Sequence, residues 1–203
     1  MKIVFAGTSQ FAVPVLKAIK SRTDWDVSLI VSEPAKPAGR KNELADSPVA
    51  VLSKGLGWNL AAPVSIKDIA GKIKSLNPDV LIIVAYGQIL PLEVINIPKF
   101  KTVNVHPSLL PKLRGPSPIQ AALKRGHKKT GVSLMLIDKE IDHGPIISQE
   151  SFSISPDDTY LTLEPKLAEL GAKIIVRDLP KHVSGEIKPQ DQNHAEATFT
   201  KLI

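Results

Sequence analysis

Residues 102–120 read TVNVHPSLLPKLRGPSPIQ, and the alternation of residue types at their start predicts a strand. Val103 and Val105 would face a core, while Asn104 and His106 would project together from the opposite face of the strand. An amide and an imidazole on one face are chemically useful groups, because the first donates hydrogen bonds and the second can also exchange a proton. We therefore treat this stretch as a candidate reaction site.

Pro107 is expected to end this strand, because proline has no N–H to donate and disfavours a helix at the preceding residue. The loop that follows is dense in proline, glycine and cationic side chains, and Ser117-Pro118 predicts the N-cap and first residue of a helix. Open parallel sheets bind ligands outside the carboxyl ends of their strands. We therefore favour a reaction site over the alternative, in which Asn104 and His106 only satisfy nearby backbone groups.

Strands and helices alternate along the rest of the chain, at a spacing that predicts an α/β, Rossmann-like fold. Its sheet would be open, twisted and mostly parallel, with helices on both faces. The apolar run DVLIIVA at residues 79–85 is typical of a central parallel strand. Further strands are expected at residues 2–6, 27–31, 58–61, 130–138 and 145–154. Helices are expected at residues 10–21, 48–54, 66–76, 89–95, 118–125 and 159–182.

The composition predicts one large domain in the cytoplasm. The chain has 203 residues, of which 43% are hydrophobic, enough for a substantial core. The absence of cysteine excludes disulfides, thiolate zinc sites and thiol nucleophiles. No apolar run approaches the roughly 20 residues of a membrane-spanning helix, and the start MKIVFAG predicts a strand rather than a signal peptide. The net charge of +6 suits an anionic partner.

A glycine turn, Gly7-Thr8-Ser9, follows the first strand, as it does in dinucleotide-binding proteins. This turn offers one glycine instead of the three of G-x-G-x-x-G, and the nearest acidic residue after the second strand is Glu33. We therefore prefer a structural role for the turn, in which a helix packs closely against a sheet.

Residues 33–47, EPAKPAGRKNELADS, are expected to form a long polar loop with Lys36, Arg40 and Lys41 near its middle. Loops of about 15 residues in compact domains are usually functional or disordered. Three cations without an aromatic side chain favour contact with a phosphate backbone over the reading of bases. A solvated, mobile loop is the alternative, and charge alone favours it.

Asn104-x-His106, the loop SLLPKLRG and Asp142 in the turn IDHG together resemble the formyltetrahydrofolate-dependent formyltransferases. Four further stretches are similar to that family, so the resemblance covers nearly the whole chain. They are FAGTSQFAVPVL, PAKPAGR, VAYGQILP and QDQNHAEATFTK. Two departures are visible. Pro107 stands where glycine is common in the family, and IDHGP replaces a more frequent L-D-x-G-D, which leaves Asp142 in place.

The resemblance implies a catalytic domain over residues 1–185, and over residues 186–203 the start of a linker to a carboxyl-terminal domain that this chain lacks. It implies transfer of the formyl group of 10-formyltetrahydrofolate to the α-amino group of initiator methionyl-tRNA, without a metal or a covalent enzyme adduct. A cytoplasmic monomer is expected.

The resemblance also assigns residues to roles. Asn104, His106 and Asp142 would form a catalytic trio. The other assignments fall into three groups: Ser108, Leu109, Leu110 and Pro111 would line the folate site, Tyr86, Gly87, Gln88 and Ile89 would wall the pteridine pocket, and Lys36, Arg40 and Lys41 would contact the tRNA.

The chemistry of formyl transfer supports the trio independently. An α-amino group has a pKa of about 7.7–8.0, so much of it is already a neutral nucleophile. The harder step is the tetrahedral intermediate, whose oxygen becomes anionic while N10 must gain a proton. Asn104 could donate to that oxygen, which is worth about 2.7–4 kcal/mol in comparable sites. His106 could assist, and Asp142 could hold the His106 tautomer and move a proton through water.

Several other functions remain open from the sequence. Glycinamide ribonucleotide formyltransferase, nucleotide-sugar formyltransferase and formyltetrahydrofolate hydrolase would use the same trio. A non-catalytic RNA-binding module belongs to a different class. It predicts salt-dependent tRNA binding that does not depend on His106, and no formyl transfer.

Overall fold

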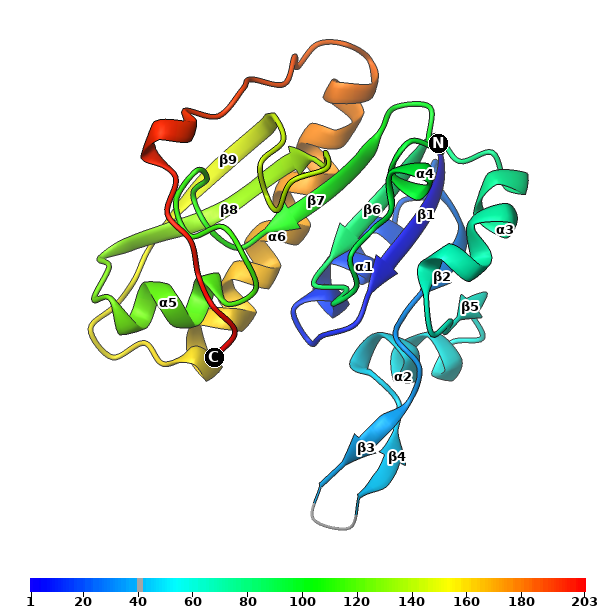
Figure 1. Ribbon diagram of the computed structural model, residues 1–203, viewed down its shortest axis with the longest axis horizontal. Coiled ribbons are helices and arrows are strands. Elements are labelled where there is room, and N and C mark those ends of the chain that lie inside the picture. The colour runs from blue at the N-terminus through cyan, green and yellow to red at the C-terminus, as the bar shows by residue number, and fades with distance from the viewer. Residues whose placement is uncertain (40–41) are drawn as a thin grey trace. The chain divides into compact units, whose positions relative to one another are not determined.

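The computed structural model describes residues 1–39 and 42–203, in two compact units, unit 1 (Met1–Thr102) and unit 2 (Val103–Ile203) (Figure 1). Unit 1 contains β1 (Lys2–Gly7), α1 (Ala12–Lys20), β2 (Asp26–Val31), β3 (Lys36–Ala38), β4 (Glu43–Ala45), α2 (Pro48–Gly55), β5 (Leu60–Ala61), η1 (Ile66–Ile69), α3 (Ala70–Ser75), β6 (Val80–Val84) and α4 (Leu92–Ile95). Unit 2 contains β7 (Thr102–His106, beginning at the last residue of unit 1), α5 (Pro118–Lys124), β8 (Lys129–Leu136), β9 (Ile146–Ser153), α6 (Tyr160–Val183) and η2 (His194–Glu196).

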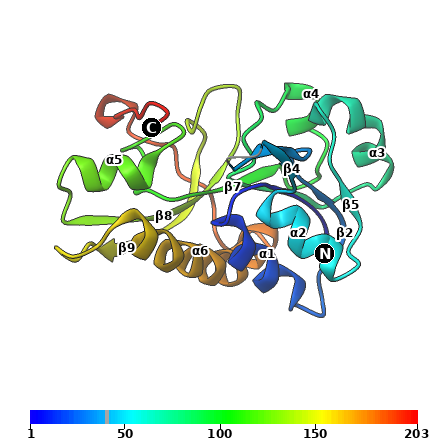
Figure 2. The ribbon, with the colours of Figure 1, turned by 90° about the horizontal axis from the view of Figure 1, so that it is seen from below.

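The strands of unit 1 form a parallel arrangement in the order β5-β2-β1-β6. Helices α1 and α2 lie on one face of these strands and α3 and α4 on the other (Figure 2). All five residues of β6 are buried, as expected for a central strand covered on both faces. The predicted α/β, Rossmann-like class is confirmed, and its parallel part lies in unit 1.

The turn after β1 has the structural role that its single glycine predicts. A Cβ atom on Gly7 would lie 2.9 Å from the Val84 carbonyl oxygen and 2.9 Å from the Cβ atom of Ala12. Only glycine therefore allows α1 to begin this close to β1 and β6.

Residues 33–47 contain a hairpin that the sequence did not predict. Strands β3 and β4 pair antiparallel, with Pro37 opposite Leu44, and all six of their residues are exposed. With neither face of this pair buried, its side chains need not alternate between apolar and polar, which is the pattern that predicts a strand. Lys36 forms an ion pair with Glu33 at 2.8 Å. The predicted tRNA contacts Arg40 and Lys41 lie outside the described residues.

The three strands of unit 2 are antiparallel, β7 to β8 and β8 to β9. These two pairs are the antiparallel part of a sheet that the sequence predicts to be mostly parallel. The turn between β8 and β9 has only nine residues, 137–145, too few for the crossover that a parallel pair needs. Helix α6 covers one face of β8 and β9, and the carboxyl-terminal segment crosses the opposite face (Figure 1, Figure 2).

Other differences from the expected elements are local. The helix expected at residues 66–76 begins as the 3₁₀ turn η1 and continues as α3. The helix expected from Ile89 begins only at Leu92, because Pro91 is extended and disfavours a helix at the residue before it. Helix α6 begins with a capping box at Thr159 and accommodates Pro165. Among the described residues, no helix is long and apolar enough to cross a membrane.

Replacing Gly131 with alanine tests the packing of β8. Its new Cβ would overlap the Glu150 carbonyl oxygen and lie 2.6 Å from Leu109 Cδ2. We expect Gly131→Ala to lower the free energy of unfolding by about 1–3 kcal/mol, as overpacking does.

The matched control is Gly71→Ala in α3, where no described atom outside the adjacent residues and the helix's own backbone lies within 4 Å of the new Cβ. This variant should gain about 0.4–1 kcal/mol. Urea unfolding of both variants is the measurement, and equal stability of the two would contradict the packing of Leu109 and β9 on Gly131.

Candidate active site

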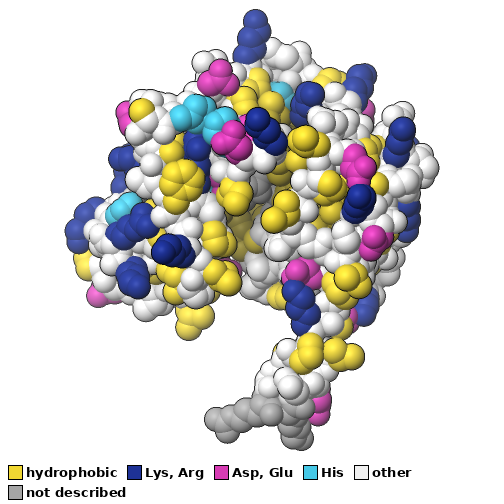
Figure 3. Space-filling view, viewed as in Figure 1, with side chains coloured by type: hydrophobic (Ala, Val, Ile, Leu, Met, Phe, Trp, Pro, Cys, Tyr) yellow, Lys and Arg dark blue, Asp and Glu magenta, His cyan; other side chains and the backbone are white. Residues whose placement is uncertain are grey.

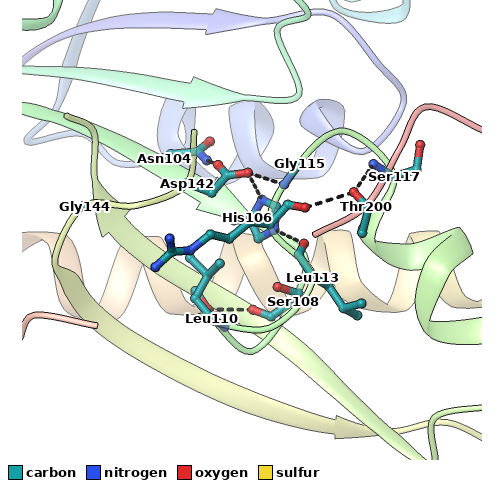
Figure 4. Close-up of polar contacts among 12 residues, drawn as sticks. Asn104, His106, Ser108, Leu110, Leu113, Gly115, Ser117, Asp142, Gly144 and Thr200 are labelled. Carbon is teal, nitrogen blue, oxygen red and sulfur yellow. Dashed lines mark hydrogen bonds and ion pairs between the residues drawn. The ribbon is translucent and has the colours of Figure 1, made fainter. Parts of the chain in front are cut away.

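Three polar side chains of unit 2 meet beside β7. Asn104 and His106 leave the same face of this strand, opposite Val103 and Val105, which are fully buried. The Asn104 amide Nδ2 donates to Asp142 Oδ1 at 3.3 Å, and His106 Nδ1 lies 3.6 Å from Asp142 Oδ2 (Figure 4). The structure therefore brings the predicted trio together.

The antiparallel pairing explains how Asp142 reaches the trio. Residue Leu136, at the end of β8, lies opposite Val103, at the start of β7. The turn after β8 therefore begins beside the start of β7 and can return over Asn104. This turn is tight, because a Cβ on Gly144 would overlap the Leu136 carbonyl oxygen, and Asp142 itself has φ +48°.

Gly115 supplies a contact to the trio that the sequence did not predict. Its backbone N–H donates to Asp142 Oδ2 at 2.7 Å (Figure 4). Gly115 has φ +104°, and a Cβ there would lie 2.8 Å from the Thr200 carbonyl oxygen. Glycine is needed at this position for both reasons, and with it the N–H can point at the carboxylate.

His106 is 4% exposed, and its ring is held from both sides. Nε2 lies 3.0 Å from the Leu113 carbonyl oxygen, which can only accept, so Nε2 carries a proton. The Leu113 carbonyl therefore helps to fix the tautomer, and the role that sequence analysis assigns to Asp142 in holding it stays a prediction. A protonated ring would find an acceptor for each N–H, the Leu113 carbonyl and the Asp142 carboxylate.

The loop predicted to line the folate site is organised by Ser133 on β8. The buried Ser133 hydroxyl donates to the Ser108 carbonyl oxygen at 2.6 Å and accepts from the Leu110 N–H at 3.1 Å. Ser108 and Leu110 are themselves buried, whereas Leu109 and Pro111 are partly exposed. No local pattern singles out Ser133, because it lies in an apolar strand 23 residues from Leu110.

The residues predicted to wall the pteridine pocket, Tyr86 to Ile89, belong to unit 1. Tyr86 is 2% exposed, and burial together with the charge of Glu33 raises the pKa of its hydroxyl to about 12. Gly87 has φ +89°, and the Gln88 side chain bonds to the backbone of a neighbouring loop. Ile89 is 91% exposed. The role assigned to these four residues stays a prediction.

The carboxyl-terminal segment, which the sequence predicts to be a linker, contacts the loop between β7 and α5. Leu113 N–H donates to Thr198 Oγ1 at 2.9 Å, and Ser117 N–H donates to Thr200 Oγ1 at 3.2 Å. Ser117 stands at the N-cap of α5, but its side chain makes no capping bond and instead accepts from the Ile203 N–H at 3.2 Å. Within residues 1–39 and 42–203, no three potential metal ligands lie together.

An α/β fold that gathers an amide, an imidazole and a carboxylate is suited to group transfer, since these groups can stabilise an oxyanion and move a proton. Residues 1–179 match the family model described as formyl transferase. The chain therefore belongs to the formyl transferase family.

Relatives and solved structures agree with this membership. The chain is 43% identical over 203 residues to a methionyl-tRNA formyltransferase of Hydrogenobaculum sp. (strain Y04AAS1). The aligned region covers 100% of this chain and 67% of that protein. A similar protein of Sulfurihydrogenibium sp. (strain YO3AOP1) is 44% identical over 208 residues, with 66% of it covered. The chain thus spans about two thirds of the length of these curated relatives.

The fold is shared with solved formyltransferases. Phosphoribosylglycinamide formyltransferase from Anaplasma phagocytophilum matches with a TM-score of 0.78 at 21% identity, over 99% of both chains. Methionyl-tRNA formyltransferase from Clostridium thermocellum matches with a TM-score of 0.64 at 23% identity, over 98% of this chain and 71% of that one. At these identities the likeness concerns the fold alone.

Removing the Ser133 hydroxyl tests how the loop at residues 108–112 is held. Ser133→Ala leaves the buried Ser108 carbonyl and Leu110 N–H without this partner, so we expect a loss of about 1–3 kcal/mol in the free energy of unfolding. Ser151→Ala, at an exposed position of β9, should change it by less than about 0.5 kcal/mol. Chemical denaturation of the two variants is the measurement, and a neutral Ser133→Ala would contradict this network.

Proposed function

We propose that this chain transfers the formyl group of 10-formyltetrahydrofolate to the α-amino group of methionyl-tRNA. The observation that carries the proposal is the contact of one carboxylate, Asp142, with both Asn104 and His106, in a chain of the formyl transferase family. Relatives that carry the name methionyl-tRNA formyltransferase are 41–44% identical over the whole chain, which supports this acceptor.

Asn104 would stabilise the oxyanion of the tetrahedral intermediate. Its amide has two N–H groups, and the contact with Asp142 uses one of them. The other is free to donate to the formyl oxygen, whose negative charge grows as the amine attacks. The acceptor of the first N–H also fixes the orientation of the amide before the substrate binds, which is what preorganised stabilisation requires.

His106 and Asp142 would handle the proton. The attacking amine becomes cationic and must lose a proton, while N10 must gain one before it can leave. With Nε2–H held by Leu113, the Nδ1 atom of His106 is the position that can take a proton, and Asp142 lies 3.6 Å from it. The carboxylate would stabilise the imidazolium while water carries the proton toward N10.

The formyl donor would bind beside the loop at residues 108–111. Ser108 and Leu110 are buried and would shape this loop, so the partly exposed Leu109 and Pro111 are the side chains available to contact folate. Tyr86 to Ile89 of unit 1 remain proposed contacts to the pteridine, as the resemblance implies. Ile89 offers the most exposed apolar surface among them.

Basic side chains favour a polyanionic acceptor such as tRNA. Lys and Arg gather over α5 and the turn that follows it (Figure 3). Four of them, Lys124, Arg125, Lys128 and Lys129, are exposed and lie in six consecutive residues without an acidic one. None forms an ion pair with a carboxylate in the described part of the chain. Unpaired cations bind phosphates with release of counterions. Lys36 on β3 remains a proposed contact, as do Arg40 and Lys41.

The proposal also concerns how this chain is divided into a catalytic domain and a segment that follows it. We propose that residues 1–185 form the catalytic domain and that residues 186–203 lead to a further domain, as the resemblance implies. Residues 192–200 of this segment also bond to the loops around the trio. A reaction on aminoacyl-tRNA would take place in the cytoplasm, where this substrate is found.

A panel of acceptors tests the proposal. The chain is incubated with 10-formyltetrahydrofolate and methionyl-tRNA, glycinamide ribonucleotide, an amino nucleotide-sugar or water alone, and the formylated product is measured. We expect formyl-methionyl-tRNA to form fastest. Faster formylation of either small amine, or release of formate in water alone, would overturn the acceptor. Salt-dependent tRNA binding without any transfer would instead support an RNA-binding module.

Asn104→Ala should lower kcat for formyl transfer by about 10²–10³-fold, because one preorganised oxyanion donor is removed. Its side chain is only half-buried, so the free energy of unfolding should change by less than about 1 kcal/mol. Asn96→Ala, at an exposed amide in unit 1, serves as control and should leave kcat unchanged. Retained turnover in Asn104→Ala would remove this residue from the mechanism.

A further inference from the structure

Residues 192–200, here called the strap, connect two loops that hold the trio. Just before the strap, Gln190 and Ile146 exchange two backbone hydrogen bonds of 2.8 Å, which fixes where the strap begins. The strap then crosses unit 2 on the face opposite α6 (Figure 1, Figure 2). One of its side chains, Gln192, is 6% exposed although the residues on either side of it are exposed.

Gln192 is oriented by a buried cation. Arg114 is 3% exposed, and its Nη2 and Nε donate to Gln192 Oε1 at 2.7 Å and 3.2 Å. Arg114 also lies 2.9 Å from His194 Nδ1, and no carboxylate pairs with it among the described residues. A guanidinium can only donate, so the oxygen of the Gln192 amide must face Arg114 and its nitrogen must face away.

The nitrogen of Gln192 is thereby aimed at the turn that carries Asp142. Nε2 donates to the Asp142 carbonyl oxygen at 2.9 Å and to the Gly144 carbonyl oxygen at 2.7 Å. Asp142 has φ +48°, a left-handed conformation that costs free energy for a residue other than glycine. Two hydrogen bonds from one fixed amide stabilise this conformation, and with it the direction of the Asp142 side chain.

The far end of the strap holds the other partners of the trio. The Arg114 backbone N–H donates to the Thr198 carbonyl oxygen at 2.9 Å, and the Thr200 N–H donates to the Arg114 carbonyl oxygen at 2.7 Å. These bonds lie between Leu113, whose carbonyl holds His106, and Gly115, whose N–H holds Asp142 (Figure 4). The strap therefore holds both the loop that contains Leu113 and Gly115 and the turn that carries Asp142.

We propose that Gln192 is a positioning residue for formyl transfer. Oriented by Arg114, it holds the Asp142 turn so that the carboxylate stays between Asn104, His106 and the Gly115 N–H. This inference rests on the proposed function for its effect on turnover, but its structural part can be measured without any substrate.

The test compares Gln192→Glu with Gln192→Met. Glutamate keeps an acceptor for Arg114 but cannot donate, and its charge would repel the two carbonyl oxygens. Methionine has a similar size, loses both interactions, and could also destabilise the fold by leaving Arg114 without Gln192. Gln192→Glu is therefore the deciding variant. Gln190→Glu introduces the same charge two residues earlier, at an exposed side chain whose Nε2 donates to the Lys188 carbonyl oxygen, and is the matched control.

Two readouts are needed: kcat and KM for formyl transfer, and the exchange rate of the Gly115 amide proton measured by NMR. For Gln192→Glu we expect kcat to fall about 10–100-fold, as misplacement of a catalytic group does, with little change in KM for the folate. The Gly115 amide should exchange at least tenfold faster, while amides of β8 keep their rates. Gln190→Glu should match the unaltered protein in both readouts.

Unchanged kcat in Gln192→Glu, or a fall in kcat with unchanged exchange at Gly115, would overturn the positioning role. A fall in kcat accompanied by faster exchange throughout unit 2 would also overturn it, since the effect would then be general destabilisation. If the unaltered protein transfers no formyl group to any acceptor, the proposed function fails, while the exchange at Gly115 still decides whether Gln192 holds the turn.

Discussion

The rest of this site depends on one hydrogen bond, which the Gly115 backbone N–H donates to the Asp142 carboxylate. It joins the loop after β7 to the turn after β8, and a charge-assisted bond of 2.7 Å is among the stronger ones in proteins. With Asp142 held there, its two oxygens face Asn104 and His106. Without it, the carboxylate would keep only its longer contacts with Asn104 and His106.

Close packing of backbone makes that bond possible. Gly115 lies against Thr200, and Gly144 lies against the Leu136 carbonyl, so neither position leaves room for a side chain. Gly131 is equally confined, by Glu150 and by Leu109 of the loop at residues 108–112. These three glycines allow neighbouring segments of unit 2 to pack closely against the backbone, as Gly7 does in unit 1. The site is thus built where loops approach a strand or one another too closely for other residue types.

Buried polar groups hold the loops in place. Ser133, Arg114 and Gln192 are each less than 10% exposed, and each bonds to backbone carbonyls or to another member of the group. Leaving such groups unpaired is costly, so the network tolerates few alternative arrangements. This gives a physical reason why an irregular turn can hold Asp142 in a fixed geometry beside Asn104 and His106 of β7.

The sequence by itself determined the parts that follow from local pattern. Apolar runs located the strands, and the alternation around residues 103–106 placed Asn104 and His106 on one face, where the structure has them. The motifs of the family identified Asp142. Only the tertiary structure decided which groups meet: the antiparallel return of β8 brings Asp142 to β7, and the strap brings Gln192 and Thr200 to the loops. Such contacts join residues 27 to 86 positions apart through single hydrogen bonds, which leave no periodic trace in the sequence.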